Sequence, residues 1–171
     1  VPLGVSTGYI EVRKGLRLRF ASWQAVLRER RGTVCIFPGR AEFIEKYFEA
    51  VGELRRRGFA VAVLDWRGQG GSSRLTRIPL KGHINEFAEY EDDLAYFMKA
   101  VVLPDCPPPY FALAHSMGGA ALLRVAHSGK RWFERMVLAA PLIDLPYARS
   151  SLLLRIPMRA LRLAGFGASY V

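Results

Sequence analysis

The chain has 171 residues and is 51% hydrophobic, which is enough for one domain with a sizeable core. Its 25 lysines and arginines outnumber 15 acidic residues, but they are scattered rather than interleaved with aromatics, which argues against a nucleic-acid partner. Attraction to anionic lipid surfaces stays open, and the two cysteines and three histidines lack the spacing of a disulfide framework or a metal site. We therefore expect reduced thiols, a cytoplasmic location with room for peripheral contact at the inner face of the membrane, and no metal or cofactor.

The first half of the chain predicts a hairpin followed by alternating buried strands and helices. Tyr9 to Arg13 and Leu16 to Ala21 are predicted as two strands, because apolar and basic residues partly alternate in them. Continuous apolar runs, typical of parallel strands buried on both faces, cover Thr33 to Phe37 and Phe59 to Leu64. Between these runs, residues 41–57 carry an apolar stripe at helical spacing and predict a helix.

The glycine-rich stretch from Asp65 to Ser72 follows the second buried strand. We interpret it as a structural loop, held by a salt bridge between Asp65 and Arg67, rather than as a catalytic one. It lacks the lysine of a phosphate-binding loop. A second helix is predicted to start at the N-cap Asn85 and to stop at Pro104.

The most informative stretch surrounds Ser116. The apolar run from Tyr110 to His115 predicts a strand, and a helix is predicted from Gly119 to Ala126. A serine before a helix often serves only as an N-cap. Here small residues lie two positions before and after the serine, Ala114 and Gly118, and such residues relieve the crowding of a very tight turn. This pattern favours a nucleophile at the apex of a strand–turn–helix unit, with alanine at a place where glycine is usual.

One more buried strand is predicted from Arg135 to Ala140. Strands that alternate with helices predict a three-layer α/β fold, with a mostly parallel sheet and helices on both faces. Sites in such sheets form at the carboxyl ends of the strands. The strand ends at Phe37, Leu64 and Leu113 should therefore lie side by side.

At this point the chain resembles the α/β-hydrolase family, and within it the branch of lysophospholipases and monoacylglycerol lipases. Six short motifs carry the resemblance, in the order and at the spacing of the family, over most of residues 9–141. They are Phe37-Pro38-Gly39-Arg40-Ala41-Glu42, Asp65-Trp66-Arg67-Gly68-Gln69-Gly70, Lys81-Gly82-His83-Ile84, Tyr90-Glu91-Asp92-Asp93-Leu94, Leu113-Ala114-His115-Ser116-Met117-Gly118-Gly119 and Ala139-Ala140-Pro141.

The resemblance implies the roles of particular residues. Ser116 would be the nucleophile, and the backbone amides of Arg40 and Met117 would form the oxyanion hole. Four neighbours of the serine would build the nucleophile elbow: Ala114, His115, Gly118 and Gly119. The implied reaction is hydrolysis of a lysophospholipid or monoacylglycerol ester through an acyl-enzyme, without a metal or cofactor.

The family also needs an acid and a histidine base after the serine, in that order along the chain. His127 lies about 15 Å along the predicted helix from Ser116, and His115 and His83 are interpreted as structural. Asp144, which follows a strand end, is the remaining candidate for the acid. We therefore expect the chain to be truncated before the last strands of the fold and to be inactive alone.

Residues 1–141 are predicted to be the N-terminal portion of the hydrolase core, and residues 142–171 the start of a cap or lid. The latter segment mixes leucines with arginines, which suits either a lid that meets lipid or a helix pair packed on the core. Two alternative functions stay open: a non-catalytic binding protein with the same fold, and a hydrolase of small soluble esters or peptides.

Overall fold

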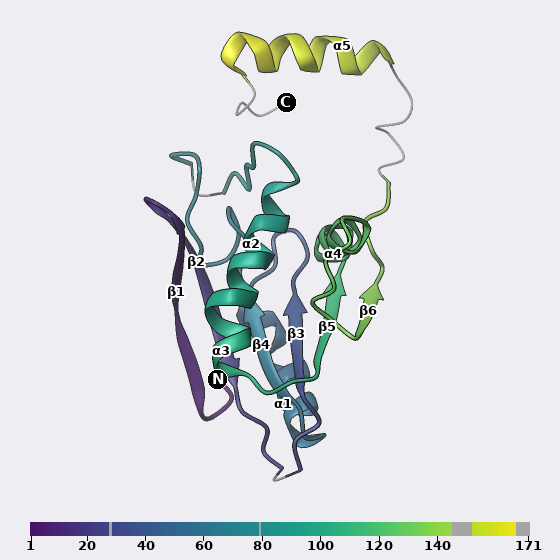
Figure 1. Cartoon of the computed structure of the whole chain (residues 1–171). Coiled ribbons are helices and arrows are strands. Elements are labelled where there is room, and N and C mark those ends of the chain that lie inside the picture. The colour runs from purple at the N-terminus through teal and green to yellow at the C-terminus, as the bar shows by residue number, and fades with distance from the viewer. Residues whose placement is uncertain (28, 79, 145–151, 167–171) are drawn as a thin grey trace. The chain divides into compact units, whose positions relative to one another are not determined.

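The computed structural model describes residues 1–27, 29–78, 80–144 and 152–166 (Figure 1). The chain divides into two compact units, Val1–Pro141 and Leu142–Val171. Within the described residues, the first unit holds a six-stranded sheet with the strand order β1-β2-β4-β3-β5-β6. The second unit contains the helix α5 (Leu152–Leu161) and the turn η3 (Arg162–Phe166).

The sheet is parallel in its larger part. Its strands are β1 (Val5–Arg13), β2 (Leu16–Trp23), β3 (Thr33–Phe37), β4 (Ala60–Leu64), β5 (Tyr110–His115) and β6 (Arg135–Ala139). The β1–β2 hairpin is antiparallel and joins β4 in an antiparallel pair, whereas β4, β3, β5 and β6 run parallel to one another. The predicted hairpin is thus confirmed, as are the two buried strands β3 and β4.

Helices cover both faces of this sheet. They are η1 (Ile44–Tyr47), α1 (Phe48–Arg56), α2 (Glu89–Phe97), η2 (Met98–Val102), α3 (Leu103–Asp105) and α4 (Met117–His127). Two separate apolar cores result, because successive strand residues point to opposite faces. One core joins Cys35 and Phe37 of β3 to α2 and α4, and the other joins Val34 and Ile36 to η1 and α1. The three-layer α/β architecture predicted from the sequence is confirmed.

The register of the parallel strands brings the predicted strand ends together. Phe37 of β3 is paired with Ala114 of β5, and Ile36 is paired with Val63 of β4. Leu64 and Leu113 therefore end their strands beside Phe37, as predicted.

Three helix boundaries differ from the prediction. The helix expected from residue 41 begins at Ile44, because Ala41 has a positive φ of 58° that no right-handed helix allows. Asn85 is not an N-cap: α2 begins at Glu89, whose carboxylate accepts a hydrogen bond from the Asn85 amide at 3.2 Å. The helical path runs one residue past Pro104, to Asp105, and Cys106 is extended.

The predicted burial of the last strand is wrong for the described structure. β6 is paired with β5 alone, and most of its side chains are exposed, with Val137 62% accessible. Cys35 and Cys106 are buried free thiols, and burial raises the pKa of both, that of Cys106 to about 11. None of the helices in the described ranges is long and apolar enough to cross a membrane.

Candidate active site

Ser116 lies in the turn that joins β5 to α4. Its backbone has φ 47° and ψ −112°, a region that residues with a side chain rarely occupy. Its amide donates to the Ala139 carbonyl at 3.0 Å, and its own carbonyl accepts the first bond of α4, from the Ala120 amide at 3.2 Å. The side chain makes no capping bond to the helix, so the N-cap alternative does not describe this serine. The hydroxyl is left for other chemistry.

Small residues make this turn possible. A Cβ atom on Gly118 would lie 2.3 Å from the Phe37 carbonyl oxygen and 2.7 Å from that of Pro38. A Cβ on Gly119 would lie 2.8 Å from Pro141 Cβ. Ala114 is 1% exposed and fits between the neighbouring strands. The elbow therefore packs directly against the end of β3.

The loop after β3 is held by side chains on both sides of Arg40. The Gly39 amide donates to Glu42 Oε2 at 2.7 Å, and the Ala41 amide donates to Gln69 Oε1 at 2.8 Å. The Arg40 amide between them has no hydrogen-bond acceptor among the described residues. Its position is thus set by two neighbours while its own donor stays unused.

The Met117 amide offers a second unused donor. It opens α4, ahead of the first intrahelical bond, at the end of the helix where the dipole is positive. Because Phe37 is paired with Ala114, Arg40 and Met117 each lie three residues beyond a paired position, at the same edge of the sheet. Two preorganised amides at one edge could stabilise a developing oxyanion. The assignment of these two amides to an oxyanion hole stays a prediction.

Glu42 connects the loop after β3 to the end of β5. Its Oε2 accepts hydrogen bonds from the Gly39 amide and the Tyr47 hydroxyl, both at 2.7 Å, and lies 3.1 Å from His115 Nδ1. Burial alone would raise the pKa of Glu42, but the bonds from Tyr47, Gly39 and His115 outweigh it and lower the pKa to about 2. Glu42 is therefore a carboxylate at neutral pH. The sequence prediction gave neither Glu42 nor Tyr47 a role in the site. Glu42 contacts His115, which is 73 positions away in the chain, and Tyr47 enters the site by donating to Glu42.

His115 differs from its expected environment. The sequence predicts a buried residue, whereas the side chain is 43% exposed and contacts Glu42. Alternation along β5 explains the difference, since Ala112 and Ala114 point into the core and His115 points away from it.

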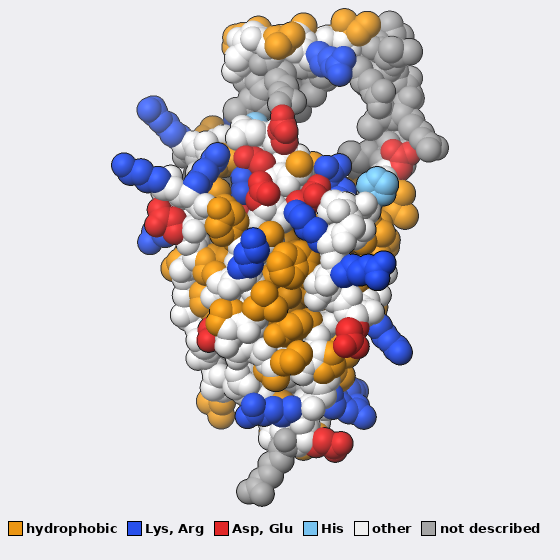
Figure 2. All heavy atoms as spheres, in the orientation of Figure 1, with side chains coloured by type: hydrophobic (Ala, Val, Ile, Leu, Met, Phe, Trp, Pro, Cys, Tyr) orange, Lys and Arg blue, Asp and Glu red, His pale blue; other side chains and the backbone are white. Residues whose placement is uncertain are grey.

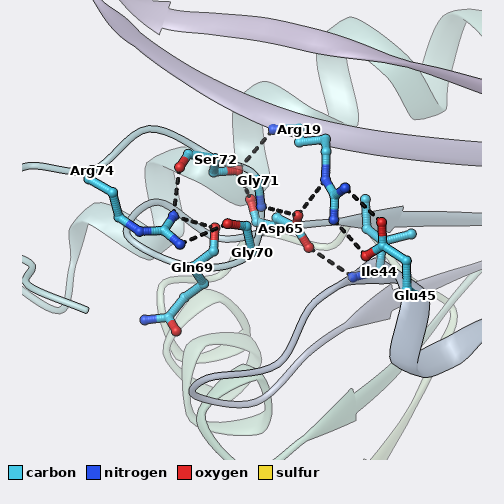
Figure 3. A network of polar contacts seen from close by, with 9 residues as sticks. All are labelled: Arg19, Ile44, Glu45, Asp65, Gln69, Gly70, Gly71, Ser72 and Arg74. Carbon is cyan, nitrogen blue, oxygen red and sulfur yellow. Dashed lines mark hydrogen bonds and ion pairs between the residues drawn. The ribbon is translucent and has the colours of Figure 1, made fainter. Parts of the chain in front are cut away.

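The loop after β4 is fixed by Asp65, which is fully buried (Figure 3). Its carboxylate accepts bonds from the Ile44 amide at 2.9 Å, the Gly71 amide at 2.7 Å and Arg19 Nε at 2.6 Å. Burial raises the pKa of Asp65 although these three bonds oppose the shift. Arg19 also pairs with Glu45 at 2.7 Å. The loops after β3 and β4 are thereby tied to each other and to the hairpin.

The predicted salt bridge between Asp65 and Arg67 is wrong. Arg67 is 3% exposed and pairs instead with Asp93 at 2.6 Å and with Glu89 at 2.8 Å, both from α2. Asp65 and Arg67 follow one another closely in sequence but turn toward different elements. The interpretation of this loop as structural agrees with these contacts.

Neither His115 nor His127 contacts Ser116. His127 is exposed at the far end of α4, and the ring of His115 is turned to Glu42. Asp144 lies in the second unit. Within the described ranges, no group of three or more His, Cys, Asp and Glu side chains could hold a metal ion.

The sequence of this chain is similar to those of known hydrolases. A family model described as serine aminopeptidase, S33, matches residues 28–166. Lysophospholipase L2 of Escherichia coli is 38% identical over 140 residues, which are 81% of this chain and 40% of that protein. The chain thus spans 40% of the length of this curated relative.

Two solved structures resemble the fold. A thermostable carboxyl esterase of Bacillus coagulans superimposes with a TM-score of 0.77 at 21% identity, over 96% of this chain and 52% of the esterase. A monoglyceride lipase of Saccharomyces cerevisiae gives a TM-score of 0.70 at 24% identity, over 95% of this chain and 54% of the lipase. At these identities the likeness establishes the fold.

Proposed function

The chain belongs to the serine aminopeptidase S33 family of α/β-hydrolase proteins, and from that membership we propose that it supplies the nucleophile and the oxyanion hole of a lipid ester hydrolase. The observation that carries the proposal is the conformation of Ser116, strained at a positive φ, with a hydroxyl that caps nothing. The unused amides of Arg40 and Met117 at the same sheet edge support it. A serine nucleophile and two oxyanion donors are two of the parts that acyl transfer to a serine requires, beside a base and its acid.

In the proposed reaction, the Ser116 oxygen attacks the carbonyl carbon of the ester while its proton passes to a base. The resulting oxyanion would accept hydrogen bonds from the Arg40 and Met117 amides. Collapse of the tetrahedral intermediate breaks the ester C–O bond and releases the glycerol-containing alcohol, which takes the proton. Water then cleaves the acyl-enzyme and releases a fatty acid. We assign neither the base nor its orienting acid to the described residues.

A lysophospholipid or a monoacylglycerol is the proposed substrate. The E. coli relative is named a lysophospholipase and the yeast structure a monoglyceride lipase, which supports a single-chain lipid ester. A peptide or a small soluble ester is the second candidate, since the matching family is described as an aminopeptidase family. Fold alone does not choose between these substrates.

The second unit is proposed to be the start of a lid. The helix α5 contains leucines together with Arg155 and Arg159, and helices of such composition bind at anionic lipid surfaces. We infer peripheral contact with the inner face of a membrane and a cytoplasmic location. Flotation with vesicles of anionic or zwitterionic lipid tests this, because contact of the proposed kind requires binding to the anionic vesicles that weakens with salt.

The test of the function compares substrates in the natural full-length protein that carries this chain. We expect hydrolysis of a micellar lysophospholipid or a monoacylglycerol, with little action on an aminoacyl amide or a short-chain ester. Ser116→Ala should abolish this hydrolysis while the far-UV circular dichroism spectrum is unchanged. Turnover by Ser116→Ala at the wild-type rate would contradict the assignment of the nucleophile. Absence of turnover of every substrate by the wild type would favour a non-catalytic binding protein.

A further inference from the structure

A pocket opens beside the loop that carries the candidate oxyanion amide. It has a volume of about 260 Å³ and is lined in part by Arg40, Ala41 and Phe43 from the loop after β3. Gln69 and Arg74 from the loop after β4 form another wall. No acidic residue is among the described residues that line it, whereas two arginines are. The pocket therefore presents positive charge and attracts an anion.

Arg40 belongs to both the site and the pocket. Its amide is one of the two unused donors, whereas its side chain is exposed and has no carboxylate partner among the described residues. A group bound in this pocket would therefore lie beside the residue whose amide is proposed for the oxyanion hole. In a glycerophospholipid, the phosphate is separated from the scissile ester only by the glycerol carbons.

Arg74 is held rigidly in the pocket wall. Its guanidinium donates to the carbonyl oxygens of Gln69 and Gly70, at 2.8 and 2.7 Å, and to that of Ser72 at 2.7 Å (Figure 3). These bonds to the backbone orient the guanidinium in the pocket wall. A charge held in place by the backbone costs little further ordering when a ligand binds.

Gln69 supplies a polar group at the same wall. Its side chain is 4% exposed, and its Oε1 accepts the Ala41 amide at 2.8 Å. Its Nε2 is buried, and a hydrogen bond from the Gln69 side chain acts on the pKa of the Tyr90 hydroxyl. A Cβ on Gly82 would lie 2.8 Å from this nitrogen, so the absence of a side chain at position 82 leaves room there. A side-chain amide next to two arginines keeps this wall of the pocket polar.

We propose that this pocket is a phosphate subsite, which binds the phosphodiester of a lysophospholipid on the leaving-group side of the scissile ester. Arginine is suited to this task, because its planar guanidinium can donate two parallel hydrogen bonds to phosphate oxygens. The inference rests on the proposed function and favours a lysophospholipid over a monoacylglycerol as the substrate, since a monoacylglycerol has no phosphate to bind in this pocket.

The first experiment measures kcat/KM of the full-length protein for a lysophospholipid and for the monoacylglycerol with the same acyl chain. In Arg40→Gln the ratio of the two values should fall about 10- to 100-fold, as expected for loss of a charge-assisted bond, and Arg40→Lys should restore part of it. Arg131→Gln is the matched control, since Arg131 is exposed and precedes β6, away from the carboxyl ends of the strands. An equal fall for both substrates in Arg40→Gln would overturn the proposal.

The second experiment does not depend on turnover. Binding of sn-glycerol 3-phosphate, inorganic phosphate and glycerol to the wild type and to Arg40→Gln is measured by calorimetry. We expect the wild type to bind glycerol 3-phosphate most tightly and Arg40→Gln to bind it at least 10-fold more weakly. Equal binding of inorganic phosphate would overturn the assignment to a lipid headgroup. If the wild type binds glycerol 3-phosphate but hydrolyses no ester, the proposed function fails and the anion site stands.

Discussion

Two glycines in helices of the first unit should respond to alanine with opposite sign. Gly118 opens α4 behind the candidate nucleophile, and Gly52 lies inside α1. A Cβ on Gly118 would lie 2.3 Å from the Phe37 carbonyl oxygen, about 1.1 Å inside the 3.4 Å at which ordinary contact begins. A Cβ on Gly52 would meet nothing nearer than Arg56 Nη1 at 3.6 Å. The two sites thus differ in crowding rather than in secondary structure.

The magnitude follows from two opposing contributions. Alanine in place of glycine stabilises a helix interior by about 0.5–1 kcal/mol, because the unfolded chain loses freedom. Overpacking costs about 1–3 kcal/mol. The upper part of that range applies to Gly118, since both crowding atoms are backbone carbonyls that cannot rotate away. We expect Gly118→Ala to lower the free energy of unfolding by about 2 kcal/mol and Gly52→Ala to raise it by about 0.5–1 kcal/mol.

Urea denaturation of the full chain, followed by far-UV circular dichroism, measures both changes against the wild type. The two variants add the same single methyl group, so differences in hydrophobicity or mass cannot explain a difference in sign. A Gly118→Ala variant as stable as Gly52→Ala would refute the close approach of the elbow to the end of β3.

Three further changes test the described contacts. Ser116→Gly should raise the free energy of unfolding by about 1 kcal/mol, because glycine accepts the positive φ, and denaturation midpoints at constant m-value measure the gain. Asp93→Asn should destabilise by about 2 kcal/mol, because Arg67 keeps Glu89 but loses its charged bonds to Asp93, whereas Arg67→Met combined with Asp93→Leu should recover most of the loss. Glu42→Gln should cost about 1–2 kcal/mol at neutral pH. The lowered pKa of Glu42 stabilises the fold above pH 4.5, and that contribution is lost as pH falls toward about 2, so acid titration should bring wild type and variant together. Stability differences that stay constant down to pH 2 would contradict this role.

Local sequence patterns predicted the fold because each strand has its own hydrophobic pattern within a few consecutive residues. Thr33–Phe37 is buried at every position, and a short apolar run that ends in Pro38-Gly39 is typical of an inner strand. The elbow was equally local, since the strand, the serine and the small residues on both sides lie within nine positions, from Tyr110 to Gly118. The distribution of charge also matched, because Figure 2 shows basic side chains spread over the visible face rather than gathered in one patch.

The ion pairs and hydrogen bonds between side chains were not predictable in the same way. Asp65 and Arg67 are two residues apart, which suggested a mutual pair, yet Asp65 binds Arg19 and Arg67 binds Asp93. The cation that pairs with a carboxylate in a loop depends on which basic side chains the tertiary fold places near it, and the local sequence does not contain that information. The assigned N-cap at Asn85 failed for a related reason, since Glu89 reaches back to its amide and the helix begins later.

The strained residues of this chain gather where the site is proposed. Outside glycine, positive φ values occur in the described residues at Ala41, Ser116 and Ala140, which follow β3, β5 and β6 at the same edge of the sheet. Each such conformation costs about 1–3 kcal/mol, and it persists only when its surroundings hold it. Here Gln69 binds the Ala41 amide, and the Ala139 carbonyl binds the Ser116 amide. Because the folded state already bears this strain, an amide aimed at a reacting oxygen need not move during the reaction. The contacts with Gln69 and Glu42 hold the loop on both sides of Arg40, and we propose that they act on the reaction through the position of the Arg40 amide.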